Sequence, residues 1–361
     1  MDTHRTPSAC TPYLFLVTLL VLLPTFSAQA TEPGQYLGAK DTEYPAWFKD
    51  SFLDLREDID EASAEGKRLM LLFYQDGCPY CNALVERNLA QKDIEQKVKK
   101  NLDVIAINMW GDREVTHVDG KVYTEKTLAE KLKVQFTPTV LFFDEDANVI
   151  LRVNGYRSPQ RFSMDVDYVA QRKEKEQNYR DYVTANRPAR RANRELNSAD
   201  FFLTGKVDLS AKGRTPGRPF AVFFEQKDCP NCDQLHSKVL PDPDLRAVMK
   251  DFDIVQLDMW SKTPVVTPSG ETLSAREWAK KLDVRYAPSI VVFNPQGEEV
   301  IRTEAFFKVF HTQGVFNYVR TEAYREQPSF QRYLSDYADH LREQGRDVNI
   351  WRLADEETVQ N

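Results

Sequence analysis

Four cysteines, arranged as two closely spaced pairs, are the residues of this 361-residue chain best suited to chemistry. The segment Cys78–Cys81 reads Cys-Pro-Tyr-Cys, and the segment Cys229–Cys232 reads Cys-Pro-Asn-Cys. Each pair follows an apolar run that predicts a buried strand, Leu69–Tyr74 in the first case and Phe220–Glu225 in the second. Two thiols at this spacing, between a strand and a helix, are typical of a dithiol that cycles with a disulfide.

The predicted position of each first cysteine favours its reactive form. Cys78 should lie at a helix N-terminus, where free N–H groups and the helix dipole stabilise a thiolate. Pro79 suits the first helical turn, because its missing N–H is not needed there. Cys81, one turn further into the helix, should be less exposed and positioned to resolve a mixed disulfide.

Length and composition limit the classes of function. A chain of 361 residues predicts two domains of about 100–200 residues each. Apolar residues at 42% and charged residues at 29% fit a soluble globular protein. The formal net charge is −7, and no large basic patch is interleaved with aromatic residues, so nucleic acid is not expected as a partner.

The first 30 residues predict a cleavable secretory signal. Tyr13–Leu23 is an apolar run too short to span a bilayer, which needs about 20 residues, and Ala28–Ala30 is a cleavage site of the A-x-A type. Cleavage would remove Cys10 and leave only the two CxxC pairs. We therefore expect the mature chain to begin near Thr31 and to be soluble in the periplasm. An uncleaved membrane anchor is the alternative.

The second half of the chain repeats the first. Thr137–Pro138 matches Ala287–Pro288, since 287 − 137 = 150, and Met109–Trp110 matches Met259–Trp260 at the same offset. A period of this length indicates duplicated domains. The charged segment between the halves predicts a solvated helix and linker, with the domain boundary near Pro188. The expected parts are a signal at 1–30, domains at 31–185 and 186–345, and a polar tail at 346–361 that frays.

Each half predicts the same order of elements: strand, CxxC, helix, strand, helix, X-Pro, strand pair and final helix. A further helix is predicted before the first strand, because apolar residues recur at helical spacing from Trp47 to Ala62. Trp110 and Trp260 follow strand ends, where packing in the core or a lid is a simpler interpretation than client contact. His117, His311 and His340 have no cysteine or histidine at useful spacing, so no role is expected for them.

This order and these motifs resemble the thioredoxin superfamily across nearly the whole mature chain. More narrowly, the helix before the first strand, Gly66–Arg68 and the long loop before the X-Pro are similar to SoxW-type periplasmic thioredoxins. The resemblance implies an α/β fold with two tandem domains, each a central mixed β-sheet flanked by α-helices. It also implies thiol–disulfide exchange with client proteins, no cofactor, and a membrane thiol-electron carrier as a possible reductant.

The resemblance assigns roles to particular residues. The attacking cysteines would be Cys78 and Cys229, and the resolving cysteines Cys81 and Cys232. The X-Pro bonds would be cis, and the loops that offer backbone groups to an extended client would contain Thr137, Pro138, Ala287 and Pro288. The residues between the cysteines affect the redox potential, and here they are Pro79, Tyr80, Pro230 and Asn231. Because the two dipeptides differ, we expect unequal potentials, without knowing which site is more oxidising.

The sequence also departs from the cytoplasmic thioredoxins. Those proteins carry a buried acid in the strand before the motif, whereas Leu72 and Phe223 occupy that place here. The resolving cysteines would then depend on solvent or on another group to take the proton.

Two alternatives to a thioredoxin-like reductant stay open from the sequence. One is an oxidase or isomerase of the protein disulfide isomerase kind. The other is a non-catalytic metal-binding dithiol protein, in which Cys229, Cys232 and His236 supply three ligands. We favour redox chemistry because both CxxC pairs are intact. The sequence does not predict the oligomeric state, the client or the electron donor.

Overall fold

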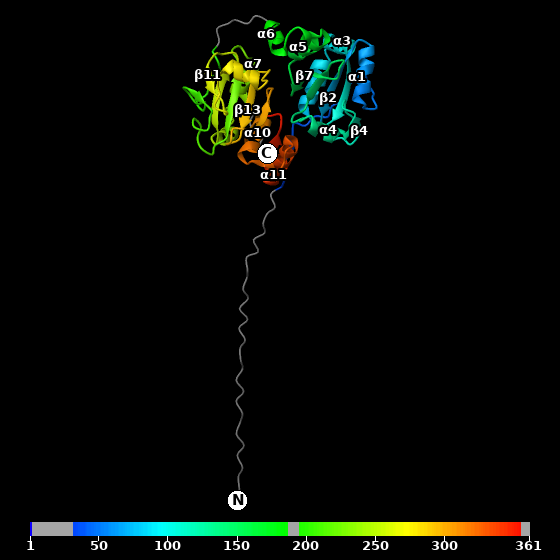
Figure 1. Ribbon diagram of the computed structural model, residues 1–361. Coiled ribbons are helices and arrows are strands. Elements are labelled where there is room, and N and C mark those ends of the chain that lie inside the picture. The colour runs from blue at the N-terminus through cyan, green and yellow to red at the C-terminus, as the bar shows by residue number, and fades with distance from the viewer. Residues whose placement is uncertain (2–31, 187–194, 355–361) are drawn as a thin grey trace.

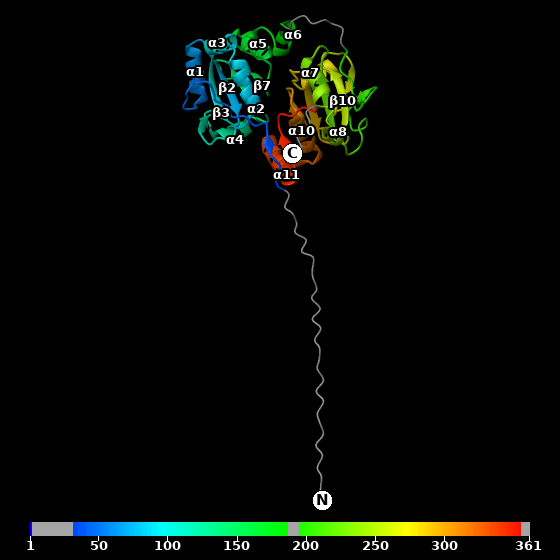
Figure 2. The ribbon, with the colours of Figure 1, turned by 180° about the vertical axis from the view of Figure 1, so that it is seen from behind.

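Two α/β domains of similar build lie side by side in the computed structural model, which describes residues 1, 32–186 and 195–354 (Figures 1 and 2). The expected signal at 1–30 and the expected boundary near Pro188 lie outside the described residues. In the described part of the chain, no helix has both the length and the apolar character needed to cross a membrane.

The first domain is built on a four-stranded mixed sheet in the order β3-β2-β6-β7. Strand β2 pairs in parallel with β3 and antiparallel with β6, and β7 closes the other edge antiparallel to β6. The strands of the domain are β2 (Arg68–Tyr74), β3 (Leu102–Asn108), β4 (Glu114–Thr116), β5 (Val122–Thr124), β6 (Thr139–Phe143) and β7 (Val149–Asn154). Its helices are α1 (Leu55–Ala64), α2 (Pro79–Ala83), the π-helical η1 (Leu84–Leu89), α3 (Lys92–Asn101), α4 (Glu125–Lys131), α5 (Pro159–Ala170), η2 (Lys173–Lys175) and α6 (Tyr179–Ala185).

The second domain repeats this sheet in the order β10-β9-β13-β14, with the same parallel and antiparallel pairings. Its strands are β8 (Val207–Asp208), β9 (Phe220–Glu225), β10 (Asp253–Asp258), β11 (Pro264–Val266), β12 (Thr272–Ser274), β13 (Ser289–Phe293) and β14 (Glu299–Thr303). Its helices are α7 (Pro230–Lys238), α8 (Pro243–Met249), α9 (Ala275–Lys281), α10 (Val309–Arg320), η3 (Ala323–Arg325) and α11 (Phe330–Glu343). The expected fold class, two tandem mixed sheets flanked by helices, is confirmed.

The strands that lead into the CxxC motifs are central in their sheets. Residues Leu69–Phe73 of β2 and Phe220–Glu225 of β9 are all buried, because helices cover both faces of each sheet. A strand buried on both faces needs a continuous apolar run, which is the pattern that the sequence shows. Each strand therefore delivers its motif from a rigid support.

The helix expected from Trp47 to Ala62 is shorter than predicted. It begins only at Leu55, because Leu53 has a positive φ of 66° and Asp54 then caps the helix by accepting from the N–H groups of Arg56 and Glu57. Side-chain oxygens of Asp satisfy first-turn N–H groups well, so this residue sets the start. Tyr44, Trp47 and Phe48 pack on the first domain in irregular structure instead, whereas Phe52 is exposed.

The fraying expected for the C-terminal tail is wrong for its described part. Strand β15 (Val348–Asn349) pairs in parallel with β1 (Tyr36–Leu37), from the lead before the first domain. Val348 and Ile350 are buried in the apolar cluster of the second domain. Trp351, Leu353 and Ala354 pack on the same cluster, so apolar side chains within a polar stretch dock this segment. The N-terminal lead is thereby tied to the second domain.

The two domains meet through equivalent residues. Asn154 Nδ2 donates to Glu304 Oε2 at 2.7 Å, and these residues correspond, since 304 − 154 = 150. A Cβ added to Gly155 would lie 2.8 Å from the Cβ of Ala305, its counterpart at the same offset. Contacts between equivalent residues are the signature of a two-fold axis, so the duplicated domains pack like a symmetric dimer.

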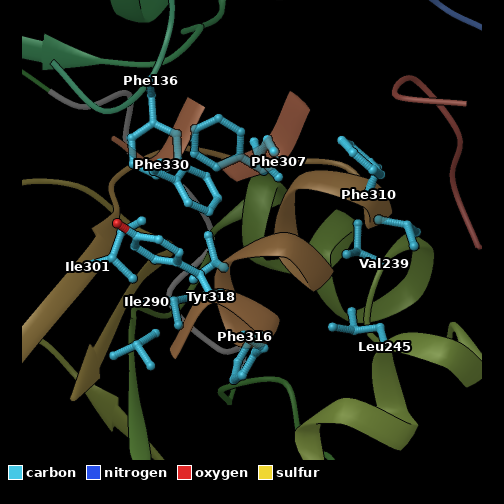
Figure 3. Close-up of a cluster of buried hydrophobic side chains, with 14 of the residues drawn as sticks. Phe136, Val239, Leu245, Ile290, Ile301, Phe307, Phe310, Phe316, Tyr318 and Phe330 are labelled. Carbon is cyan, nitrogen blue, oxygen red and sulfur yellow. The ribbon is translucent and has the colours of Figure 1, made fainter. Parts of the chain in front are cut away.

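The apolar core of the second domain extends into the first. Phe136 of the first domain packs against Phe307 and Phe330, with ring centroids 4.9 and 5.3 Å away (Figure 3). Cys78, Tyr80 and Phe136 belong to the same buried cluster as the helices α10 and α11. The first CxxC motif is therefore enclosed between the domains.

Candidate functional site

Both cysteine pairs form disulfides at helix starts. Cys78 pairs with Cys81 and Cys229 pairs with Cys232, with Cα atoms 5.3 and 5.1 Å apart. The first cysteine of each pair is the N-cap of its helix, α2 or α7, and its Sγ accepts the N–H of the second cysteine at 3.1 Å in both sites. This contact would also stabilise a thiolate in the reduced state.

All four cysteines of the two CxxC pairs are buried. The exposed fractions are 3% for Cys78 and 4% for Cys229, against 1% for Cys81 and 0% for Cys232. The first cysteine of each pair therefore keeps slightly more exposed surface than the second.

The X-Pro loops lie against the disulfides. The bonds Thr137–Pro138 and Ala287–Pro288 are both cis. Cys78 Sγ lies 3.7 Å from the carbonyl oxygen of Thr137, and Cys229 Sγ lies 3.6 Å from that of Ala287. The structure thus brings together every loop and cysteine residue that the sequence singled out.

Tyr80, between the first pair of cysteines, is held by the second domain. The N–H of Lys308 donates to its hydroxyl at 3.1 Å, and its ring packs edge-on against Phe307, His311 and Trp351. Burial raises the pKa of the Tyr80 phenol, which therefore stays neutral. The dipeptide thus anchors a domain interface, a role that its position in the motif did not predict.

His311 is a site residue that sequence reasoning missed. It is buried beside Tyr80, burial lowers its pKa from 6.5 to about 4, and its Nδ1 has no hydrogen-bond partner among the described residues. The imidazole is therefore neutral at physiological pH. Its contact with the first motif joins residues far apart in sequence, so no local pattern signals it.

A cleft of about 460 Å³ leads to the first disulfide. The first domain contributes Cys78, Trp110 and Thr137 to its lining, and the second contributes His311 and Arg332 among others. Its walls therefore come from both domains, and the first motif is a composite site.

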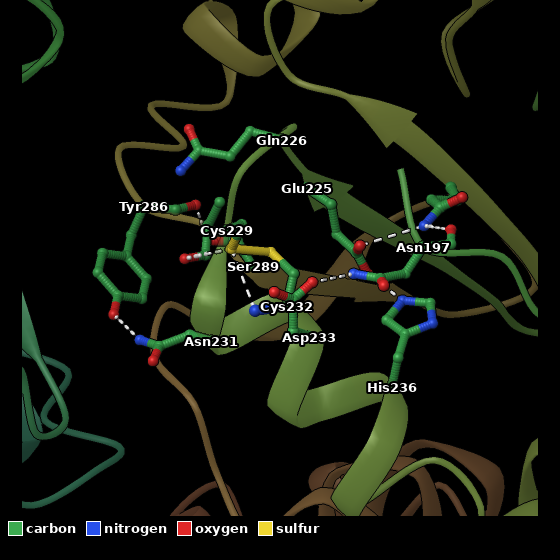
Figure 4. Close-up of a disulfide and its surroundings, with 12 residues drawn as sticks. Asn197, Glu225, Gln226, Cys229, Asn231, Cys232, Asp233, His236, Tyr286 and Ser289 are labelled. Carbon is green, nitrogen blue, oxygen red and sulfur yellow. Dashed lines mark hydrogen bonds and ion pairs between the residues drawn. A yellow bond between two sulfur atoms is a disulfide. The ribbon is translucent and has the colours of Figure 1, made fainter. Parts of the chain in front are cut away.

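The second site contains a buried carboxylate below its disulfide (Figure 4). Glu225 at the end of β9 has no exposed surface, its Oε1 lies 2.8 Å from His236 Nε2, and its Oε2 accepts from Gln256 Nε2 at 3.1 Å. The equivalent residues of the first domain are Tyr74 and Val85, since 225 − 74 and 236 − 85 are both 151. An acid is thus present, two residues beyond the position where the sequence comparison expected it.

A sequence model described as a thioredoxin-like domain matches residues 55–170 and 211–313, which together are more than half of the chain. The chain belongs to the thioredoxin-like domain family. Among curated proteins, none matches it.

Several solved structures are similar to parts of this thioredoxin-like chain. A thioredoxin-fold protein from Helicobacter pylori is 19% identical, with a TM-score of 0.32, over 38% of this chain and 86% of its own. A thioredoxin from Thermus thermophilus is 22% identical, with a TM-score of 0.26, over 32% and 84%. The C-terminal domain of DsbD from Neisseria meningitidis, in its reduced form, is 18% identical, with a TM-score of 0.24, over 32% and 93%.

The tryptophans beside the two thioredoxin-like sites are tethered alike. Trp110 Nε1 donates to Gln75 Oε1 at 3.0 Å, and Trp260 Nε1 donates to Gln226 Oε1 at 2.9 Å. An arginine of the other domain lies over each ring: Arg332 over Trp110 and Arg180 over Trp260. These tryptophans line the redox clefts and also contact the neighbouring domain.

Around the second thioredoxin-like motif, the three residues considered as metal ligands have other partners. His236, which would be the third ligand, uses Nε2 to bond Glu225, and Cys229 and Cys232 are joined to each other. Within the described ranges, no three histidine, cysteine or acidic side chains are grouped so that they could hold a metal ion. The geometry of His236 fits a partner for the buried carboxylate.

Proposed function

We propose that this protein is a periplasmic thiol–disulfide oxidoreductase that reduces disulfides of client proteins through two CxxC sites. The observation that carries this proposal is the twofold occurrence of a CxxC disulfide at a helix start, 3.6–3.7 Å from the carbonyl of a cis X-Pro loop, in thioredoxin-like domains. The periplasmic location rests on the predicted signal at 1–30.

The proposed reaction starts with both cysteines of a site reduced. The Cys78 thiolate attacks one sulfur of the client disulfide, forming a mixed disulfide while the client S–S bond breaks and the departing thiolate takes a proton. The Cys81 thiolate then attacks Cys78 Sγ, releasing the second client thiol and forming the Cys78–Cys81 disulfide. Two electrons pass from the dithiol to the client. Cys229 and Cys232 act in the same order, and a thiol-electron carrier restores each dithiol.

The cis-Pro loops would hold the client. Thr137 and Ala287 precede the cis prolines, so their backbone groups can pair with an extended client segment beside the attacking sulfur. Because the first site lies in a cleft of about 460 Å³ between domains, its clients would present an extended segment rather than a folded surface.

Trapping the mixed disulfide tests this proposal. In reduced Cys81→Ser and Cys232→Ser variants the second attack cannot occur, so each should accumulate a covalent adduct with a disulfide-bonded client, visible on a non-reducing gel. The Cys78→Ser and Cys229→Ser variants serve as matched controls that should form no adduct at the altered site. Absence of adducts from both resolver variants, with no reduction by the unmodified chain, would overturn the proposal.

A further inference from the structure

Each domain covers the redox site of the other with side chains of different chemistry. The three covering positions correspond at an offset of 150: they are Arg157, Arg161 and Arg180 in the first domain, and Phe307, His311 and Phe330 in the second. At these three positions the CPYC site faces two phenyl rings and a neutral imidazole, whereas the CPNC site faces three guanidinium groups. Elsewhere the CPYC cleft is also lined by Arg332 and Arg342, together with the acids Asp76 and Asp339.

The guanidinium groups lie on the loop residues of the CPNC site. The Cζ atoms of Arg157 and Arg161 are 5.0 and 5.8 Å from the ring centroid of Tyr286, the residue before the Ala287–Pro288 pair. Arg180 Cζ is 4.1 Å from the ring centroid of Trp260. These contacts place Arg157 and Arg161 at the residue before the Ala287–Pro288 loop, and Arg180 at Trp260.

The positive charge there is only partly balanced. Asp165 accepts two hydrogen bonds from Arg157 Nη1, at 2.9 and 3.0 Å. The same carboxylate forms a longer ion pair with Arg161, whose Nε lies 3.9 Å from Oδ1, so one acid serves two arginines. Within the described residues Arg180 forms no ion pair, although its Nη2 donates to the carbonyl oxygen of Met259. Arginine does not lose its proton in proteins, so an excess of positive charge remains.

Three of these N–H donors are buried without a partner. Arg157 Nε, Arg161 Nε and Arg180 Nη1 each lack a hydrogen-bond acceptor among the described residues. Buried charged donors left unpaired are costly and rare, so each one indicates an acceptor that completes the site. Water could accept the hydrogen bonds, but only an anion would also balance the charge.

A pocket of matching size lies at these groups. Arg161 and Arg180 line it together with Tyr286 and Ala287, and its volume is about 30 Å³. That is roughly the space of one water molecule, so the pocket has room for one carboxylate oxygen but not for a tetrahedral phosphate or sulfate. Ala287, which lines the pocket, also has its carbonyl oxygen 3.6 Å from Cys229 Sγ, so a single residue connects the pocket to that sulfur.

We propose that this pocket binds a carboxylate carried by the disulfide compound that the CPNC site reduces, with Arg161 and Arg180 as its ligands. The inference rests on the proposed function and adds a substrate class to it: disulfides with a carboxylate next to the reacting sulfur. An acidic side chain flanking a client cysteine and a carboxylate of a small-molecule disulfide are two sources of the same group. At the CPYC site the arginines of the cleft, Arg332 and Arg342, are accompanied by Asp76 and Asp339, so no preference for a carboxylate is expected there.

Single-turnover reduction of matched disulfide peptides tests the preference. The pre-reduced Cys78→Ser/Cys81→Ser variant keeps only the CPNC site, and it should reduce a peptide disulfide flanked by Glu about tenfold faster than the Gln-flanked peptide at low salt. Arg161→Gln and Arg180→Gln should each remove most of this ratio, and Arg161→Lys should keep part of it. Arg56→Gln, which removes an exposed arginine far along the chain, should leave the ratio unchanged.

The chain also contains its own control. The Cys229→Ser/Cys232→Ser variant keeps only the CPYC site, which should show no preference for the Glu peptide. Comparing the reduction rates of oxidised glutathione and its neutral ester distinguishes the two sources of the carboxylate. An arginine-dependent preference for oxidised glutathione over its ester would assign the pocket to small disulfides. A preference that appears only with the peptides would assign the pocket to client proteins. Equal rates for charged and neutral members of both pairs would overturn the inference.

A binding measurement separates this inference from the proposed function. A labelled Glu-flanked peptide with Ser in place of Cys cannot undergo exchange, so fluorescence anisotropy reports binding to the oxidised chain alone. Arg161→Gln should weaken this binding about tenfold. Binding that depends on Arg161 in a protein that reduces no disulfide would sink the proposed function and keep the carboxylate site. Exchange activity with no difference between the Glu and Gln peptides would keep the proposed function and sink the carboxylate site.

Discussion

At the scale of single residues, the two sites share their cysteines, cis prolines and tryptophans but differ in several polar neighbours. Thr137 donates its hydroxyl to Cys78 Sγ at 3.3 Å, whereas the corresponding Ala287 has no such group. The buried carboxylate Glu225 has only Tyr74 as its counterpart. Such differences change the stability of the thiolate and the transfer of its proton, and both determine how fast a site works.

The Glu225–His236 pair should assist the resolving cysteine. Cys232 and His236 lie four residues apart on α7 and thus on one side of the helix. Replacing Glu225 by Gln should slow release of the mixed disulfide at the CPNC site by about 100-fold, the usual contribution of a positioned base. Rapid-quench kinetics across pH in the Cys78→Ser/Cys81→Ser background would measure it. Tyr74→Phe, at the equivalent position, is the control, and an unchanged rate for Glu225→Gln would refute the role.

His311 should make stability depend on acid. Its folded-state pKa of about 4 lies below the 6.5 of an unfolded histidine, so under pH 6.5 the unfolded chain binds a proton that the folded chain does not. Between pH 7 and 4.5 this lowers the free energy of unfolding by about 2–3 kcal/mol. The His311→Phe variant should lack that component in urea titrations, whereas His340→Gln at an exposed histidine should keep it. Parallel pH profiles for His311→Phe and the unmodified chain would contradict the assignment.

At the scale of elements, the end of β7 connects a cis-Pro loop to the domain interface. The N–H of Gly155 donates to the carbonyl oxygen of Pro138 at 2.8 Å, and its Cα faces Ala305 of the second domain. Gly155 has a φ of +77°, a conformation that glycine adopts without strain. Loop geometry and domain packing therefore depend on the same residue.

Adding a methyl group at Gly155 should loosen the domains. Gly155→Ala combines backbone strain with a 2.8 Å contact to Ala305, whereas Gly120→Ala has a similar φ of +78° and nothing within 4 Å. The difference in unfolding free energy between the two variants should be about 1–3 kcal/mol, the usual cost of overpacking. In the reduced state, Gly155→Ala should also alkylate faster at Cys78. Equal destabilisation by both variants would mean that the interface is not tightly packed there.

Local patterns predicted most of these elements, and contacts between distant segments account for the misses. The apolar runs fixed β2 and β9, and Pro79 and Pro230 marked the starts of α2 and α7. No sequence pattern near the cysteines predicted that each motif is covered by the other domain. Arg161 and His311 acquire their roles only because the duplicated domains pack about a two-fold axis, and spacing along one chain does not show which faces meet.

At the scale of the whole molecule, the two duplicated domains pack like the subunits of a dimer. Residues of each domain line the CxxC site of the other. Both attacking cysteines are nearly buried, so each domain limits what reaches the other's sulfur. The CPYC site is packed against aromatic groups, which desolvate a thiolate and disfavour it, and its arginines Arg332 and Arg342 are accompanied by Asp76 and Asp339. The CPNC site lies beside unbalanced guanidinium groups, which favour a thiolate. A site whose reduced form is stabilised is the stronger oxidant, so the CPNC site should have the higher reduction potential.

Equilibration of each site with glutathione tests the central claim, that two domains of one fold hold chemically distinct redox sites. The Cys229→Ser/Cys232→Ser and Cys78→Ser/Cys81→Ser variants each retain one pair, and its oxidised fraction is measured against the ratio of reduced to oxidised glutathione. We predict two separate midpoints, with the Cys229–Cys232 pair the more oxidising by about 30 mV or more, equivalent to about tenfold in the equilibrium constant. Coincident midpoints, or the opposite order, would contradict the account.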